Sequence, residues 1–85
     1  MSHRASKRFW RLFAELPPEV QILARQNFAL LKQNPRHPSL HLKRLGQFWS
    51  VRIGLHYRAV GINSPAGITW FWVGNHEEYD KLFGK

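Results

Sequence analysis

Two arginines and a histidine–tyrosine pair are the residues of this chain best suited to chemistry on an anion. Arg52 and Arg58 stand six residues apart in the stretch WSVRIGLHYRAV. Arginine presents a fixed fork of donors that matches phosphate. His76 and Tyr79 are three residues apart, so they are neighbours on one face of a helix, and an imidazole can give or take a proton near neutral pH. The pattern indicates a site that binds a phosphate and moves a proton. The alternative for His76 is an ordinary polar residue at a helix start.

The length of the turn between the two arginines decides whether they share a face of a hairpin. A three-residue loop, 54–56, pairs Arg52 directly with Arg58, whereas a two-residue loop puts them on opposite faces. The longer loop is favoured because it leaves both arginines on one face and gathers on the other the side chains that need burial, Trp49, Val51, Ile53, Tyr57 and Ala59. Like charges directly across a strand pair destabilise the sheet by about 0.2–1 kcal/mol. A bridging anion would relieve that cost, although two long side chains extending into water would also do so.

Two helices are expected before the arginines. Ser6 can cap a helix with apolar residues at i, i+3, i+4 and i+7, from Phe9 to Leu16, and Pro17 ends it. Pro18 can begin a second helix that Asn34-Pro35 stops. The short joint predicts a helical hairpin, and the following stretch, NPRHPSLHLKRLGQ, is expected to be mostly irregular.

The second half of the chain reads as a meander of strands. Runs rich in Val, Ile, Trp, Tyr and Phe predict strands at about 48–53, 57–62 and 68–73. Asn75 can then cap a short helix through HEEYDKLF. The predicted fold class is α+β, an N-terminal helical hairpin packed on a small antiparallel sheet with a short C-terminal helix, in one domain over residues 1–85.

Composition narrows the class of partner. The 85 residues contain 13 Lys and Arg against 5 Asp and Glu, a net charge of +8, which favours nucleic acids or acidic proteins. Cysteine is absent from the sequence, so disulfides and thiolate metal sites are excluded. The longest apolar run is far shorter than the roughly 20 residues that span a bilayer. A cytoplasmic protein without membrane contact is expected.

Four segments carry a family resemblance through their order and spacing: LPPEVQ, NPRHPSLHLKRL, WSVRIGLHYRAV and WFWVGNHEEYDKL. Together they resemble the RelE/ParE superfamily of bacterial toxins from type II toxin–antitoxin pairs, over nearly the whole chain. The resemblance implies a small antiparallel sheet on a helical hairpin, the architecture reached above. Members commonly begin with a strand. Only MSHRA precedes the first helix here, so that strand is expected to be very short or absent.

The resemblance also implies roles for individual residues. Catalysis falls to Arg52 and Arg58 on the phosphate, to His76 where the family has arginine or histidine, and to Tyr79 in base stacking or proton transfer. Further RNA contacts are expected at Lys43, Arg44, Ser50 and Trp72. Ser50 departs from the family, because some ribonuclease members carry a lysine there, for which Lys43 or Arg44 could compensate.

Three functions remain open on this resemblance. RelE-like members cleave mRNA in the ribosomal A site through the 2′-hydroxyl, without a metal or small-molecule cofactor. ParE-like members inhibit DNA gyrase and are not nucleases. A toxin-like fold without chemistry, kept as a binding module, is the third. Arg52, Arg58, His76 and Tyr79 favour the endoribonuclease, and Ser50 keeps the others open. The expected partners are a cognate acidic antitoxin, the ribosome and mRNA.

Two other patterns are set aside. His37 and His41 have a zinc-like i, i+4 spacing, but Pro38 lies between them and a third ligand is not evident. Trp70 and Trp72 could stack on bases, yet neighbouring strand residues face opposite ways, so at least one residue of the run WFW is core. We expect Trp70 to be buried, and Trp72 to lie near Arg58.

Overall fold

Two helices form the first layer of the molecule. The computed structural model describes residues 2–84. Helix α1 spans Lys7–Phe13, and the Ser6 hydroxyl at its N-cap accepts a hydrogen bond from the Phe9 N–H at 3.2 Å. Helix α2 spans Pro18–Gln33, with a proline in its first turn, as expected. Both predicted helices are confirmed, although α1 ends one turn before Leu16.

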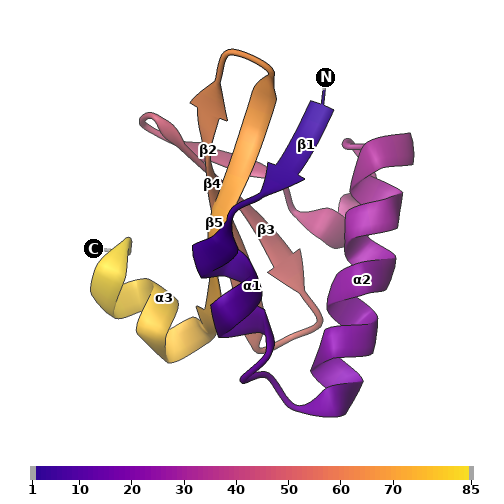
Figure 1. Cartoon of the computed structure of the whole chain (residues 1–85), viewed down its shortest axis with the longest axis vertical. Helices are drawn as coiled ribbons and strands as arrows, with labels where there is room; N and C mark the ends of the chain where they lie inside the picture. The colour runs from indigo at the N-terminus through magenta and orange to yellow at the C-terminus, as the bar shows by residue number, and fades with distance from the viewer. Residues whose placement is uncertain (1, 85) are drawn as a thin grey trace.

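A five-stranded sheet in the order β1-β5-β4-β3-β2 forms the second layer (Figure 1). Strand β3 spans Phe48–Ile53, β4 spans Tyr57–Ser64 and β5 spans Gly67–Asn75, which confirms the three predicted strands. They pair in antiparallel fashion. The α+β class is confirmed.

Two short edge strands complete the sheet: the N-terminal one agrees with the expectation of a very short strand, and the other was not expected. The N-terminal strand β1, Ser2–Ala5, is present, and it runs parallel to β5, so the sheet is mixed. At Gly67, opposite Ser2, an added Cβ would collide with the Ser2 carbonyl, so the missing side chain allows this close approach. At the other edge, the stretch expected to be irregular contains a short 3₁₀ helix, Pro38–Leu40, and strand β2, Lys43–Leu45, paired antiparallel with β3.

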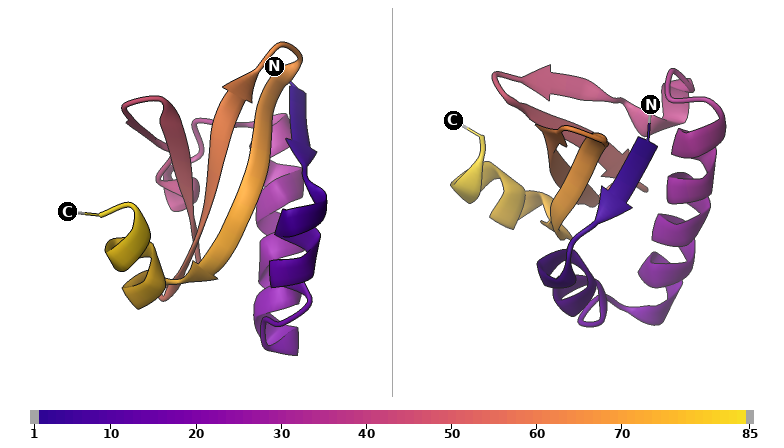
Figure 2. Two further views of the ribbon diagram at one scale, coloured as in Figure 1. Left: turned by 60° about the vertical axis from the view of Figure 1, so that its left-hand side comes forward. Right: turned by 45° about the horizontal axis from the view of Figure 1, so that its top comes forward.

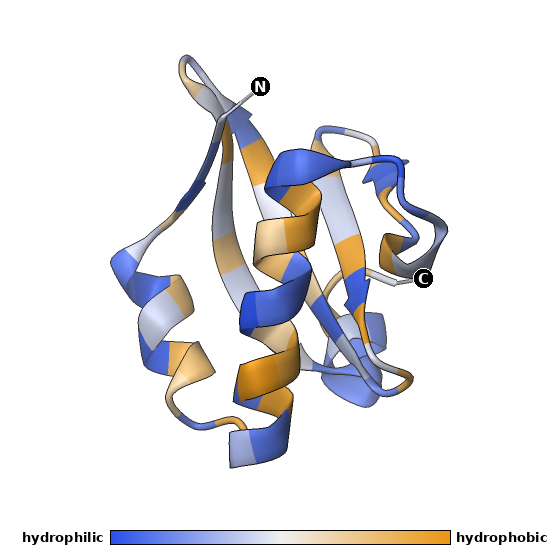
Figure 3. Ribbon diagram, turned by 90° about the vertical axis from the view of Figure 1, so that its right-hand side faces the viewer, coloured by the Kyte–Doolittle hydropathy of each residue, from blue (hydrophilic) through white to orange (hydrophobic). Residues whose placement is uncertain are grey.

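The inner face of the sheet packs against α1 and α2 (Figure 2). Figure 3 shows hydrophobic and hydrophilic residues alternating along α2, as an amphipathic helix requires. The centre of this core is Trp70, which is 1% exposed. Its indole N–H donates to Nδ1 of the buried His3 at 3.2 Å. Burial, followed by nearby positive charge including Lys32, lowers the pKa of His3 below its ordinary 6.5. The inner face is thus a closed apolar core with one neutral imidazole.

The outer face is partly covered by helix α3, His76–Leu82, which lies on the opposite side of the sheet from α1 and α2 (Figure 2). Beneath α3, a second cluster contains Val60, Trp72 and Tyr79, with phenylalanines packed around it. A bulge in β5 opposite the Val60/Gly61 step explains why Trp70 faces inward and Trp72 outward. The outer face, which was expected to be basic, therefore also carries an aromatic cluster. Within residues 2–84, no helix has the length and apolar character to cross a membrane.

Candidate active site

The β3–β4 hairpin sets Arg52 and Arg58 side by side. The register pairs Ile53 with Tyr57 and Arg52 with Arg58, so the loop is the predicted three-residue one. Gly54 opens this loop with φ +62°, a conformation that favours glycine, and an added Cβ would come within 2.8 Å of a Leu23 methyl carbon. Because directly paired residues project from the same face, both arginines leave the sheet on its outer side.

Arg58 is held by the start of α3. Its Nε donates to His76 Nδ1 at 3.3 Å, and its guanidinium carbon lies 5.1 Å from the centre of the Tyr79 ring. Its NH1 group is buried and has no hydrogen-bond partner within residues 2–84. Leaving a donor buried without a partner costs about 1–3 kcal/mol, more when the group is charged. An anion from solvent could satisfy this donor only if the side chains that cover it moved.

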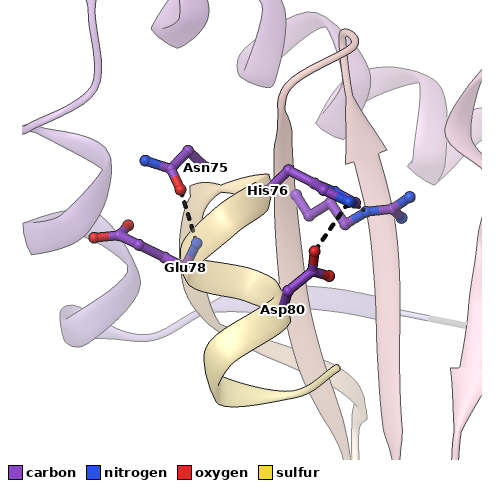
Figure 4. A network of polar contacts seen from close by, with 5 residues as sticks. Asn75, His76, Glu78 and Asp80 are labelled. Atoms are coloured by element: carbon purple, nitrogen blue, oxygen red, sulfur yellow. Dashed lines mark hydrogen bonds and ion pairs between the residues drawn. The ribbon is translucent and has the colours of Figure 1, made fainter. Parts of the chain in front are cut away.

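His76 is oriented from both sides of its ring. The Asn75 side chain caps α3 by accepting from the Glu78 N–H at 2.8 Å (Figure 4). The His76 backbone N–H donates to the His56 carbonyl at 2.7 Å. Nε2 lies 3.4 Å from an Asp80 carboxylate oxygen (Figure 4). Since Nδ1 accepts from Arg58, these contacts assign the ring proton of the neutral imidazole to Nε2. The lone pair of Nδ1 then faces the arginine pair.

Arg52 is held at the opposite end of the pair. Its Nε donates to the Gly54 carbonyl at 2.9 Å, and its NH1 lies 3.4 Å from His41 Nε2. Over residues 2–84 the structure contains one contact of ion-pair geometry, between the His76 imidazole and the Asp80 carboxylate, and none between an arginine or lysine and a carboxylate. Neither arginine contacts an acidic residue there, so the pair concentrates positive charge without a neighbouring carboxylate.

The other predicted site residues divide between the two faces. Lys43 pairs directly with Ser50 across β2 and β3, so it is exposed on the outer face beside the arginines. Arg44 pairs with Trp49 and stacks its guanidinium on that indole at 5.2 Å. Because neighbouring strand residues alternate, Arg44 lies on the inner side of the sheet, away from Arg52 and Arg58.

Three expectations about nucleic-acid contact need correction. Ser50 is 0% exposed, Trp72 6% and Tyr79 7%. The Tyr79 ring packs against Trp72 and His76 at centroid distances of 6.4 and 6.1 Å. Stacking on a base or contacting RNA directly requires surface that these side chains do not offer, because the aromatic cluster under α3 fills the space. Tyr79 instead contacts Arg58 and His76, and Trp72 packs behind Tyr79.

Two residues of the site escaped the sequence-based analysis. Asp80 lies one turn after His76, and their i, i+4 spacing on the predicted helix could have revealed the contact. His41 lies near Arg52 because the chain after it pairs with β3 as β2, and the sequence did not predict β2. Within residues 2–84, no group of three or more His, Cys, Asp or Glu side chains is placed to hold a metal ion.

The geometry combines two neighbouring guanidinium groups with an imidazole whose Nδ1 accepts a hydrogen bond from one of them. Such an arrangement can bind a phosphate group and exchange a proton with an atom attached to it. The residues in this arrangement are Arg52, Arg58 and His76, with Asp80 in contact with His76 and Tyr79 in contact with Arg58 and His76.

Comparison with known proteins gives the same family as the resemblance. The model of the ParE-like toxin domain matches residues 18–81. The crystal structure of the RelB-RelE antitoxin–toxin complex from Methanococcus jannaschii contains a similar chain, with a TM-score of 0.67 and 18% identity, over 93% of this chain and 98% of that one. The isolated RelE toxin of E. coli gives a TM-score of 0.63 and 15% identity, over 93% and 90%. Curated protein sequences give no match. The chain therefore belongs to the ParE-like toxin domain family, within the RelE/ParE superfamily of toxins.

Proposed function

We propose that this toxin is a ribosome-dependent endoribonuclease that stops translation by cleaving mRNA in the A site. The observation that carries the proposal is the contact between Arg58 Nε and His76 Nδ1 at 3.3 Å, next to a second arginine on the paired strand. RNA cleavage through the 2′-hydroxyl needs a proton acceptor and cations on the phosphate at one place. Gyrase inhibition, which is binding alone, needs no proton acceptor there.

Lys43 would supply the cation that Ser50 does not. It stands directly across from Ser50 on the same face, one step along the strands from the arginine pair. A flexible lysine at this position can reach the phosphate region that a lysine in place of Ser50 would serve. The departure from the family pattern at Ser50 is then compensated by a neighbouring strand.

The partner that restrains the toxin would be an acidic antitoxin. A net charge of +8 on 85 residues favours an acidic protein, and one of the similar structures is an antitoxin–toxin complex. The toxin would act in the cytoplasm on ribosomes and mRNA. The chemistry proposed for Arg52, Arg58 and His76 does not require a metal or another cofactor.

Purified toxin added to programmed ribosomes tests this function. The expected result is cleavage at the A-site codon, giving an upstream fragment that ends in a 2′,3′-cyclic phosphate and a downstream fragment with a 5′-hydroxyl. Arg58→Ala is expected to abolish the cuts. Intact message at toxin doses that arrest growth would contradict the proposal.

A second candidate function is inhibition of DNA gyrase, which the match to a ParE-like family model favours. A supercoiling assay separates the two. Loss of gyrase activity at stoichiometric toxin, with no cleavage of ribosome-bound message, would establish the second candidate. Unaffected supercoiling together with A-site cleavage supports the nuclease.

A further inference from the structure

An apolar hollow of about 210 Å³ lies between α1, α2 and the inner face of the sheet. Three alanines line it from three different elements: Ala5 of β1, Ala24 of α2 and Ala59 of β4. A methyl group fills less of the space between packed layers than the larger side chains around it, so room remains among them. The hollow shares no residue with the candidate active site, which lies on the other side of the sheet.

Aromatic rings form much of the wall of this hollow. Phe9 and Phe13 of α1 and Trp70 of β5 line it and are buried, and Phe28 lines it from α2. An apolar cavity of about 150 Å³ can hold a benzene ring, so a hollow of about 210 Å³ has room for a ring and a short chain. Aromatic rings pack favourably against one another, edge to face or offset. The interior therefore suits a small aromatic group.

Two cationic side chains of α2 also line the hollow. The Arg25 guanidinium carbon lies 5.0 Å from the centre of the Phe13 ring and 5.4 Å from that of Trp10, so Arg25 reaches across from α2 to α1. The Lys32 Nζ lies 4.8 Å from the centre of the Phe28 ring. Aromatic faces attract both cations and hold them at the hollow.

Neither cation is matched by an acidic side chain of the protein. Arg25 and Lys32 are exposed, and within the described part of the chain no arginine or lysine contacts a carboxylate. They are seven residues apart, about two helical turns, so they lie on the same side of α2. A guanidinium can bind a carboxylate through two parallel hydrogen bonds. The exposed edge of the hollow therefore attracts an anion.

We propose that this hollow is a binding site for a small aromatic carboxylate. The ring would occupy the space beside Phe9, Phe13 and Trp70, and Arg25 would bind the carboxylate. Lys32 would add positive charge nearby. The volume and the charge both favour this ligand class over a neutral or cationic one. A helix of an acidic protein is less well matched, because it needs a groove for several spaced side chains, whereas this hollow has room for one ring.

The four tryptophans provide the first test, with 3-phenylpropanoate as the probe. Trp10 and Trp70 line the hollow, whereas Trp49 and Trp72 do not. In an NMR titration of the full chain, the indole N–H signals of Trp10 and Trp70 should shift with a Kd of about 0.1–1 mM. The signals of Trp49 and Trp72 should stay in place. Absence of the first two shifts at about 10 mM ligand, or shifts confined to Trp49 and Trp72, would overturn the proposal.

A comparison of ligands tests the role of charge. The alcohol 3-phenylpropan-1-ol keeps the ring and the chain but lacks the carboxylate, and 3-phenylpropylamine carries a cation instead. We expect the alcohol to bind about tenfold more weakly than the acid, and the amine more weakly still. Equal affinities for the acid and the alcohol would mean that the hollow binds apolar groups without regard to charge, which contradicts the proposal.

Substitutions of arginine locate the carboxylate. Arg25→Gln should weaken binding of 3-phenylpropanoate about tenfold. Arg8→Gln makes the same change of net charge at an exposed position of α1 outside the hollow, and should bind within about twofold of the unmodified toxin. Arg58→Gln should also bind normally. Loss of binding in Arg58→Gln with normal binding in Arg25→Gln would place the ligand at the arginine pair and refute the site between the helices.

Filling the hollow tests the position of the ring. Ala24→Leu adds three carbons inside it and should abolish binding, with circular dichroism and a thermal melt to check the fold. If that variant does not fold, Ala29→Leu, at an exposed position that also lines the hollow, should weaken binding instead. Normal binding in a folded variant with the hollow filled would overturn the proposal. These titrations use no ribosomes, so their outcome is independent of whether the toxin cleaves mRNA.

Discussion

The two faces of the sheet use aromatic residues for different ends. On the inner face, α1 and α2 close over Trp70, and the core contains no charged side chain. On the outer face, α3 covers only part of the sheet, and its aromatic cluster adjoins Arg58. The packing of the inner face therefore mainly stabilises the fold. The packing of the outer face also holds the guanidinium of Arg58 and the imidazole of His76 in place.

The largest effect is expected from opening the inner face. Trp70→Ala removes an indole that is 1% exposed, and such truncations cost about 3–5 kcal/mol in the free energy of unfolding. That is a large share of the roughly 5–15 kcal/mol that stabilises a typical domain. Urea denaturation followed by circular dichroism measures it. Ile22→Ala, at a side chain 60% exposed on α2, should stay within about 0.5 kcal/mol. Similar losses in the two variants would contradict the assignment of Trp70 to the core.

On the outer face, the support of His76 should matter for rate. Asp80→Ala removes the carboxylate at His76 Nε2, and we expect A-site cleavage to slow on the order of tenfold, about 1.4 kcal/mol of activation free energy. NMR of the imidazole nitrogens should show the Nε2–H tautomer losing population. Glu77→Ala, at an exposed carboxylate on the same helix, is the control. An unchanged tautomer population in Asp80→Ala would show that Asp80 does not fix the tautomer of His76.

A smaller effect, of opposite sign, is expected at Ser50. Its hydroxyl is fully buried and has no hydrogen-bond partner within residues 2–84. Ser50→Ala should therefore leave the free energy of unfolding unchanged or raise it by up to about 1 kcal/mol. Ser64→Ala, which removes a hydroxyl that donates to the Gly67 carbonyl, should lower it by about 0.5–1.5 kcal/mol. Loss of cleavage in a stable Ser50→Ala toxin would restore Ser50 as an RNA-contacting residue.

The smallest effect concerns pH and the inner face. Burial lowers the pKa of His3 below 6.5, so the unfolded chain binds a proton more readily than the folded one. The contribution of His3 to stability is complete above about pH 6.5 and declines as the pH falls below that value, because protonation of Nδ1 would break the bond from Trp70. Thermal melts between pH 7.5 and 5.5 should show a weaker pH dependence for His3→Gln than for the unmodified toxin. Identical pH dependence would contradict this role.

The sequence predicted local elements better than it predicted contacts between them. The helix caps at Ser6 and Asn75 and the pairing of Arg52 with Arg58 depend on residues close in the chain, and the structure bears them out. Strands β1 and β2 are short and lack the alternation that marks longer strands, so tertiary pairing, not local propensity, forms them.

The candidate site shows the same limit. The pairing of Arg52 with Arg58 could be predicted from hairpin register, whereas His76 was placed beside them through the family resemblance. The burial of Trp72 and Tyr79 depends on how α3 folds back over the sheet, and the contact between His41 and Arg52 depends on the pairing of β2 with β3. Those arrangements are long-range, and a single sequence does not encode them in any local pattern.

The most direct test of the account compares one substitution on the two faces. Arg58→Gln on the outer face and Arg44→Gln on the inner side both remove a guanidinium that lies on an aromatic ring. On programmed ribosomes, we predict that Arg58→Gln lowers the rate of A-site cleavage by about 100-fold to 1,000-fold, whereas Arg44→Gln stays within about threefold of the unmodified toxin. Equal losses in both variants, or a larger loss for Arg44→Gln, would contradict the placement of the active site on the outer face.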